Sequence, residues 1–443
     1  MTRSNPYRYV LFAGHMSMWA LLAAVWVFSA CPAAGSGLDI DSDRGGKVKA
    51  ALTAADYRES SIQSFLAGEE WHTAVIDARL KNRTFFSSNV SMDIHYQVTA
   101  AAGDEPKAEA AFAEQYAGVD LPAFSGAAAA GDRTALLDMD SVIHHGSDGK
   151  IRHRLDRLNI DFQNASAGVT IGRQAVTWGN GLMFNPMDLI NPFSPYDQDT
   201  DYKTGQDMVY GRLFLESGGE LQLLFAPRRD FSNGDVRFSE SSLAAKYHGF
   251  VNRMEIDLMA GIHYRDAVVG AGLSGYFKGA AWRTDLVYTA AEEDTDDNFA
   301  SLIANIDYSW IMWDKNLYGF LEFYYSGIGT ADAKDAYSNR DLLEKMGRGE
   351  VFVTGRTYLG AGLQVELTPL LNVDTTVSAS LDDGSCLVQP QVVWGMTRNT
   401  EVTAGGTSGF GGSGEAYGNL SIPGTNLSFD TGSSIYLWWT RYF

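Results

Sequence analysis

Residues 253–265, RMEIDLMAGIHYR, alternate between apolar and polar side chains with a period of two. This is the period of a β-strand, in which successive side chains point to opposite faces of the sheet. The segments 357–367 and 371–381 repeat the alternation, which predicts an all-β protein. In the first segment the apolar face carries Met254, Ile256, Leu258, Ala260, Ile262 and Tyr264, and the polar face carries Arg253, Glu255, Asp257, His263 and Arg265.

The predicted strands are joined by connections of two kinds. Short turns, such as residues 313–316 and 382–385, alternate with long polar connections, such as residues 292–298 and 328–353. Short turns at one end and long loops at the other are typical of an outer-membrane barrel. A soluble sandwich or propeller is the alternative, but strands of 11–13 residues are long for either class. We therefore expect a transmembrane antiparallel β-barrel.

The number of strands follows from counting backwards from the C-terminus. Fifteen strands are predicted between residues 151 and 443, and an even barrel needs an odd number more upstream. The upstream candidates are residues 70–80, 88–99 and 134–145. We predict about 18 strands, with 16 as the alternative. The same count places residues 175–206 at the end of the barrel opposite Phe443.

The first 35 residues have the features of a secretory signal peptide. Arg3 and Arg8 precede an apolar core at residues 18–30, and small residues follow as a cleavage site. We predict that residues 1–35 are a signal peptide, that residues 36–68 are a periplasmic lead-in, and that residues 69–443 form the barrel. Beyond residue 35 the chain has no apolar run of 18 residues, which excludes a helical membrane protein.

The chain is strongly acidic. Its formal net charge is −20, and removal of residues 1–35, which carry two arginines and no acidic residue, would change it to −22. This charge argues against nucleic-acid binding, which requires basic patches. In a channel it favours a mild preference for cations. Cys386 is the one cysteine after residue 35, so the processed chain has no intramolecular disulfide.

The polar faces of the predicted strands are the candidate pore lining. An interior of 16 to 18 strands is too wide for side chains to fill, and mixed charges across a hydrated lumen tune the passage of polar solutes. The alternative is a closed lumen filled by cross-strand ion pairs. The predicted pore-lining residues are Arg157, Asp161, Tyr210, Arg212, Glu255, Asp257, Arg283, Asp285, Asp307, Glu366 and Asp374.

One long connection is apolar. Residues 178–197, WGNGLMFNPMDLINPFSPYD, contain three prolines, which would stiffen the segment. An apolar loop of this length is unfavourable in water, so we expect it to fold into the lumen as a constriction. The alternative is a rigid lid packed on the barrel rim. The residues predicted to form the constriction are Trp178, Phe184, Asn185, Asp188, Asn191 and Phe193.

Motifs of enzymes, metal sites and cofactors are weak. Asp197, Asp199 and Asp201 have the first spacing of a calcium-binding loop, but the required glycine and glutamate are missing. His144, His145 and His153 do not have a diagnostic metal spacing. We therefore predict a protein that is not an enzyme, with no catalytic residue, no metal and no cofactor.

Two segments resemble known proteins. The chain ends on SSIYLWWTRYF, which resembles the last strand of bacterial outer-membrane barrels, although Arg441 departs from that pattern. This resemblance implies that the barrel-assembly machinery recognises Phe443. Residues 172–197 resemble a stretch of porin-like outer-membrane proteins of Gram-negative bacteria, including the alginate-export type.

The porin-like resemblance implies a location, and the predicted lumen indicates a function. The location is the outer membrane, in contact with its lipid and lipopolysaccharide. The resemblance does not carry a substrate with it, but the mixed charges of the predicted lumen favour a porin-like channel for diffusion or export of small polar or charged solutes. The alternative is a barrel that sheathes a periplasmic partner, either a cytochrome electron conduit or an export machinery. The chain has no haem-binding CxxCH motif, so any haem would come from that partner.

Overall fold

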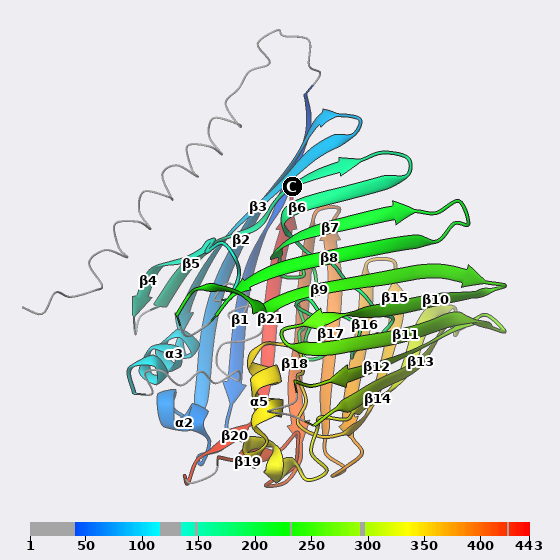
Figure 1. The fold of residues 1–443 in the computed structure, drawn as a ribbon. Helices are drawn as coiled ribbons and strands as arrows, with labels where there is room; N and C mark the ends of the chain where they lie inside the picture. The colour runs from blue at the N-terminus through cyan, green and yellow to red at the C-terminus, as the bar shows by residue number, and fades with distance from the viewer. Residues whose placement is uncertain (1–39, 116–133, 147–148, 231–232, 293–296, 423–424) are drawn as a thin grey trace, which may run out of the picture.

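The structure is a computed structural model that describes residues 40–115, 134–146, 149–230, 233–292, 297–422 and 425–443. Eighteen antiparallel strands close into one barrel, so the predicted fold class and strand number are confirmed. Figure 1 shows how the strands surround the lumen. The ring follows the chain order and closes where the last strand pairs with the first. Its strands are β1 (Asp41–Asp56), β2 (Glu70–Ser87), β3 (Val90–Gly103), β5 (Gly149–Gln163), β6 (Ala167–Gln174), β7 (Gln206–Phe214), β8 (Glu220–Arg229), β9 (Val236–Val251), β10 (Met254–His263), β11 (Asp266–Phe277), β12 (Ala280–Ala290), β13 (Phe299–Met312), β14 (Lys315–Ser326), β15 (Thr357–Thr368), β16 (Leu371–Ser380), β17 (Cys386–Thr397), β18 (Thr400–Phe410) and β21 (Ser433–Tyr442).

The prediction that residues 36–68 form a lead-in, with the barrel starting at residue 69, is wrong. Strand β1 pairs along its whole length with β2 and over Lys47–Asp56 with β21, so it closes the barrel. The pattern was missed because two outward residues of β1, Ala50 and Ala54, are alanines, which give a weak apolar alternation. The predicted signal peptide, residues 1–35, lies outside the described residues.

The candidate strand at residues 134–145 is not one of the eighteen. It forms the short strand β4 (Asp140–Gly146), which pairs with β5 on the same side as β6. Strand β6 has only eight residues, so β4 continues the wall beside β5 beyond the point where β6 ends. The preceding residues reach across to β8, where Ala135 bridges to Arg228.

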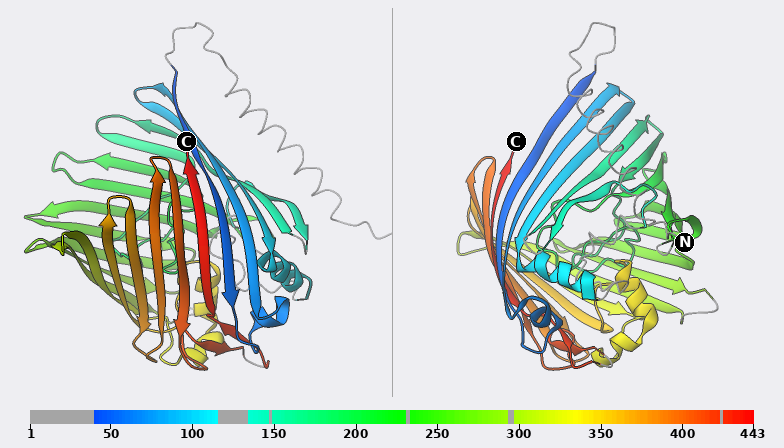
Figure 2. Two further views of the ribbon diagram at one scale, coloured as in Figure 1. Left: turned by 180° about the vertical axis from the view of Figure 1, so that it is seen from behind. Right: turned by 90° about the vertical axis from the view of Figure 1, so that its left-hand side faces the viewer.

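The two ends of the barrel differ. The turns between strands are short at the end where Phe443 lies, and longer connections with helices occur mainly at the other end (Figure 2). Asp56, the last residue of β1, pairs with Glu70 and with Ser433, so β1 ends opposite Phe443. Neighbouring strands alternate in direction, so β6 also ends there, and the connection between β6 and β7 starts at that end. The remaining elements are α2 (Ile62–Ala67), α3 (Asp104–Gln115), η2 (Ala333–Ser338), α5 (Arg340–Gly347), β19 (Asn419–Ser421) and β20 (Ser428–Asp430). None of the helices that the structure describes is long and apolar enough to cross a bilayer.

Alternation along the strands separates an apolar outer face from a polar inner face. On β10, Leu258 is 50 % exposed, whereas the preceding Asp257 is 5 % exposed. Exposed apolar side chains of this kind suit contact with lipid, as in transmembrane barrels. Outward leucines exposed by 49–59 % occur on seven strands, as Leu52, Leu80, Leu223, Leu258, Leu286, Leu321 and Leu437. The buried apolar clusters of the protein therefore do not lie between two layers but inside the barrel and at its rim.

Candidate functional site: the lumen and the inward loop

The connection between β6 and β7, residues 175–205, lies against inward side chains of the barrel wall and is here named the inward loop. Its apolar residues Trp178, Met187 and Ile190 are buried. They pack on inward residues of six consecutive strands, which supply Met208, Leu224, Ala226, Ala244, Met259, Val268 and Val287. This contact accounts for the apolar sequence of the loop, because burial removes these side chains from water.

A single carboxylate on β14 holds the middle of the inward loop. Glu322 is fully buried and accepts hydrogen bonds from three consecutive backbone N–H groups. The donors are Leu182 N at 2.6 Å, Met183 N at 2.9 Å and Phe184 N at 2.7 Å. The side-chain amide of Asn305 donates a fourth bond at 3.0 Å. Four donors around one carboxylate satisfy groups that would otherwise be unpaired in a buried site.

A second tether lies on β10 and β12. The backbone N–H of Asn180 donates to Asp285 at 2.7 Å, and its side-chain amide donates to Asp285 at 2.7 Å and to Asp257 at 3.2 Å. The side-chain amide of Asn305 donates to the carbonyl of Asn180 at 3.0 Å. Two residues predicted from alternation, Asp257 and Asp285, are therefore anchors of the inward loop.

Aromatic contacts fix the loop to the wall formed by β14, β15 and β17. The ring of Phe184 stacks on Tyr324 with centroids 4.5 Å apart, and Tyr358 lies 5.8 Å away. Further along the loop, Gln389 donates to the carbonyl of Tyr196 at 3.1 Å. The Tyr196 hydroxyl lies 3.2 Å from the hydroxyl of Tyr417. Stacked and edge-to-face rings add specific orientation to the apolar contact.

The loop is also braced within itself. Lys203 donates to both oxygens of Asp188 at 2.6 Å and to the carbonyl of Val176 at 2.5 Å. Burial raises the pKa of Asp188 to about 6, although Lys203 opposes this shift, and burial lowers the pKa of Lys203. Asn185 donates to the carbonyl of Trp178 at 2.8 Å.

The other two residues predicted for the constriction are less strongly held. Asn191 has a φ of 49°, which is the left-handed region that asparagine tolerates, and its amide lies 3.5 Å from the carbonyl of Thr204. Phe193 is half-buried.

The last part of the inward loop meets a basic stretch of wall on β1 and β2. Lys47 donates to Asp201 at 2.8 Å, and Lys49 pairs with Asp199. Beside them, Lys81 donates to the hydroxyl of Tyr202 at 2.9 Å. The two lysines of β1 pair with Asp199 and Asp201, two of the three carboxylates whose spacing suggested calcium. Within the described residues, no three histidine, cysteine, aspartate or glutamate side chains come together as a metal site.

The basic wall continues onto β5 through a β-bulge. The register between β3 and β5 shifts between His95 and Tyr96, so that Asp156 has no partner on β3 and turns inward. Asp156 is buried beside three cations: Arg79 at 2.7 Å, Arg157 at 2.6 Å and Arg154 at 3.7 Å. Alternation alone could not place Asp156, because a bulge reverses the faces of the residues that follow it.

Between the basic wall and the inward loop lies a recess of about 340 Å³. Cations outnumber anions among its lining residues, and the inward loop contributes Asp199, Tyr202 and Thr204. The guanidinium of Arg79 lies 4.3 Å from the centre of the Tyr202 ring, a cation–π contact. The charged residues that line it are Lys47, Lys49, Asp77, Arg79, Arg152, Arg154, Asp156 and Asp199.

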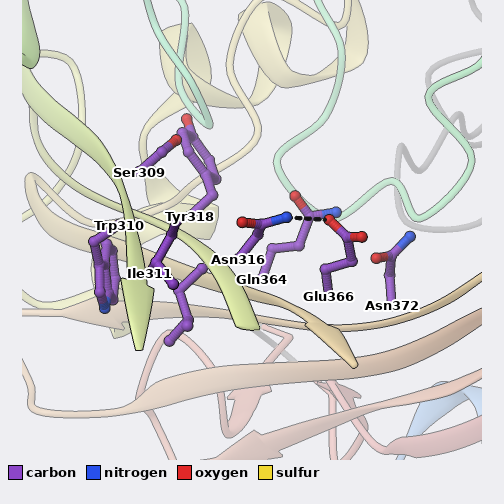
Figure 3. A pocket seen from close by; sticks show the side chains of 9 residues that line it. Ser309, Trp310, Ile311, Asn316, Tyr318, Gln364, Glu366 and Asn372 are labelled. Atoms are coloured by element: carbon purple, nitrogen blue, oxygen red, sulfur yellow. Dashed lines mark hydrogen bonds between the residues drawn. The ribbon is translucent and has the colours of Figure 1, made fainter. Parts of the chain in front are cut away.

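The opposite wall is acidic and rich in amides. Its strands β13 to β16 carry a recess of about 420 Å³ close to the short turns. Figure 3 shows the side chains that line this recess. There, Asn316 donates to Glu366 at 2.9 Å. Further from the Phe443 end on the same side, Arg283 on β12 pairs with Asp307 on β13. The lumen therefore has a basic wall facing an acidic and amide-rich wall.

The predicted pore-lining residues fall into three groups. Arg157, Asp257 and Asp285 bond the inward loop directly. Tyr210 packs against the apolar cluster of the loop, and Arg212 lies 3.7 Å from Asp161. The others lie on the wall away from the loop, as Glu255, Arg283, Asp307, Glu366 and Asp374.

Sequence reasoning missed several residues that hold the site. Glu322 lies between Leu321 and Phe323 in an aromatic strand, and nothing in that pattern distinguishes it from a solvated glutamate. Lys47 and Lys49 were missed with β1. The buried pair of Arg173 and Asp207, 2.9 Å apart, flanks the inward loop on both sides, and the Arg-Gln end of β6 was the one available signal.

Similarity to known proteins lies in the fold. No protein-family model matches the chain, and no curated protein sequence is similar enough to count as a relative. Among solved structures, OccAB1 of Acinetobacter baumannii aligns with a TM-score of 0.52 at 7 % identity, over 91 % of this chain and 96 % of that one.

Two porins of Pseudomonas align equally completely. OccK2 of Pseudomonas aeruginosa, solved in complex with glucuronate, gives a TM-score of 0.50 at 10 % identity, over 91 % of this chain and 98 % of that one. A BenF-like porin of Pseudomonas fluorescens gives 0.50 at 9 % identity with the same coverage. The chain therefore has the fold of a porin-like outer-membrane β-barrel.

Proposed function

We propose that the protein is an outer-membrane channel for small polar or charged solutes, and that the inward loop narrows its path. The observation that carries the proposal is the attachment of one loop to two well-separated parts of the barrel wall. Glu322 on β14 holds its middle, and Lys47 on β1 holds its end. A loop bonded to separate parts of the wall of a wide lumen reduces the cross-section through which a solute passes.

The charges of the two walls favour a particular class of solute. A carboxylate would be attracted to the basic wall, where Lys47, Arg79 and Arg154 line one recess. The facing wall, with Glu366 and Asp374, would attract the remainder of a dipolar or hydroxylated molecule. The mild cation preference inferred from net charge does not take this local separation into account. We infer that small organic acids are carried; OccK2, a structural neighbour, was solved with the sugar acid glucuronate.

The same loop argues against a barrel that sheathes a partner. A partner subunit inside the lumen would have to displace residues 175–205. That would break the buried bonds to Glu322 and Asp285 and expose the apolar cluster around Met187. Such a displacement is costly because buried charges would lose their partners.

The test is single-channel conductance of the purified barrel, with and without residues 180–196. The deletion should increase the conductance several-fold, and an anion such as glucuronate should interrupt the current of the intact channel. Circular dichroism and heat-modifiable migration would show that both forms are folded. Equal conductance of the two folded forms would refute the constriction, and the absence of any current would refute the channel.

A further inference from the structure

The recess on strands β13 to β16 has no part in holding the inward loop. It measures about 420 Å³, which is within the range of small-molecule pockets, roughly 300–1,000 Å³. Asn316 on β14 precedes the loop anchor Glu322 by six residues, which corresponds to about 20 Å along a strand. The recess therefore lies between the inward loop and the mouth where Phe443 ends the chain.

Register arranges the polar side chains of the recess in two rows across the wall. In one row Asn316 pairs with Glu366, and Glu366 pairs with Asn372. In the other row Tyr318 lies between Ser309 and Gln364. Figure 3 shows Asn316, Gln364, Glu366 and Asn372 projecting to the same side of the wall. We name these six residues the polar shelf.

The chemistry of the polar shelf selects among solutes. Three amides and two hydroxyls both donate and accept hydrogen bonds, which is what sugar hydroxyls require. Glu366 has no ion pair with any described residue, so it repels carboxylates. Asn316 donates to its Oε2, so one oxygen of the carboxylate is already engaged and the other can accept from a solute hydroxyl.

An apolar edge completes the shelf. Ile311, which pairs with Asn316 and so lies on the same face, is 75 % exposed and lines this recess. Carbohydrate rings have hydroxyls around their edge and C–H groups on their faces, so one apolar contact beside several amides fits such a ring. In water alone the apolar side chain of Ile311 stays hydrated, whereas a bound ring would cover it and remove apolar surface from water.

We propose that the polar shelf is a binding subsite for an uncharged, polyhydroxylated solute or the uncharged sugar part of a larger one. This inference rests on the proposed channel function and extends it. The basic wall attracts the acidic group of a solute, and the shelf holds hydroxyls on the opposite side, nearer the Phe443 mouth. A neutral sugar would then bind at the shelf without needing the basic wall.

The experiment adds maltose, a neutral disaccharide, to the wild-type channel in planar bilayers. We expect reversible interruptions of the current that saturate with maltose concentration. The double variant Gln364→Ala/Asn372→Ala should raise the half-saturating concentration roughly tenfold or more, since each lost hydrogen bond weakens binding about fivefold. The matched control is Gln222→Ala, which removes an inward amide on β8 and should leave the maltose effect unchanged.

The results separate this inference from the channel proposal. Current without maltose interruptions, or interruptions that the double variant leaves unchanged, would overturn the polar shelf while leaving the channel intact. Interruption by spermidine in place of maltose, abolished by Glu366→Gln, would identify an amine site and also overturn it. If no current is seen, maltose is titrated by calorimetry into the detergent-solubilised wild type and variants, whose folding is checked by heat-modifiable migration. A loss of maltose affinity in the double variant would support the polar shelf, and equal affinity would overturn it, independently of the channel.

Discussion

Replacement of Glu322 by alanine should release the inward loop without unfolding the barrel. The change removes the common acceptor of the backbone N–H groups of Leu182, Met183 and Phe184. In the closed position these donors would then be buried without partners, whereas in a loop displaced into the lumen they would meet water. The variant therefore shifts the balance between the closed and displaced positions.

The size of the shift follows from the number of bonds. A hydrogen bond contributes a net stabilisation of about 0.5–1.5 kcal/mol, so three bonds contribute about 2–4 kcal/mol. Each 1.4 kcal/mol changes an equilibrium roughly tenfold, which gives a rise of about 30- to 1,000-fold in the displaced population. Contacts of Phe184 with Tyr324 persist in the variant and would limit the rise to the lower part of this range.

Two assays would report the release of the loop. Single-channel records of Glu322→Ala should show frequent transitions to a higher conductance that the wild type rarely visits. Hydrogen exchange should become faster at the amides of residues 182–184 but not in the strands. Glu366→Gln is the matched control, because this carboxylate lies on the neighbouring strand and does not touch the loop. Unchanged current and unchanged exchange in a folded Glu322→Ala barrel would refute the role given to this carboxylate.

Three further predictions concern the loop and the basic wall. Burial raises the pKa of Asp188 from 3.8 to about 6, so the closed loop binds a proton more tightly than a displaced loop. Opening of the loop should therefore become rarer as the pH falls from 7 to 4, and single-channel records of Asp188→Asn should lack this trend. Arg173→Ala leaves the buried Asp207 without its ion-pair partner and should destabilise the barrel by about 3–5 kcal/mol. The midpoint of unfolding in guanidinium chloride should then fall, and an unchanged midpoint would contradict this. Lys47→Ala/Lys49→Ala frees two carboxylates of the loop and should move the reversal potential in a KCl gradient towards cation selectivity, and no movement would count against a basic pathway.

The period of two made most of the fold predictable. It marks which residues face lipid, because lipid contact requires an apolar outer face on every strand. The alternation therefore identifies Leu258 and Leu286 as outward residues. Strand β1 was not predicted, because its outward alanines are apolar enough to face lipid but give only a weak alternation. Because the strand was not predicted, Lys47 was not assigned to the lumen, although it lies there and is 3 % exposed.

The candidate site was less predictable because its partners are distant in the sequence. Asn180 is 105 residues from Asp285, and Phe184 is 138 residues from Glu322. Alternation gives the face of a carboxylate but not its partner, so Asp285 could be assigned to the lumen but not recognised as an anchor. Asp156 shows a second limit, since a bulge changes the face without any change in residue type.

The inner faces of the strands contain a signal that alternation along single strands does not use. A fully hydrated lumen would have polar inward residues on every strand, yet Met208, Leu224 and Met259 face inward on β7, β8 and β10. Such residues would contact water unless another segment covered them, and the apolar connection of residues 175–205 lies directly before β7. An apolar loop and an apolar inner wall each explain the other, because neither is stable in water alone. The two features together identify where in the lumen the loop lies, and the polar strands that remain, β13 to β17 and β1 to β5, define the walls left for a solute.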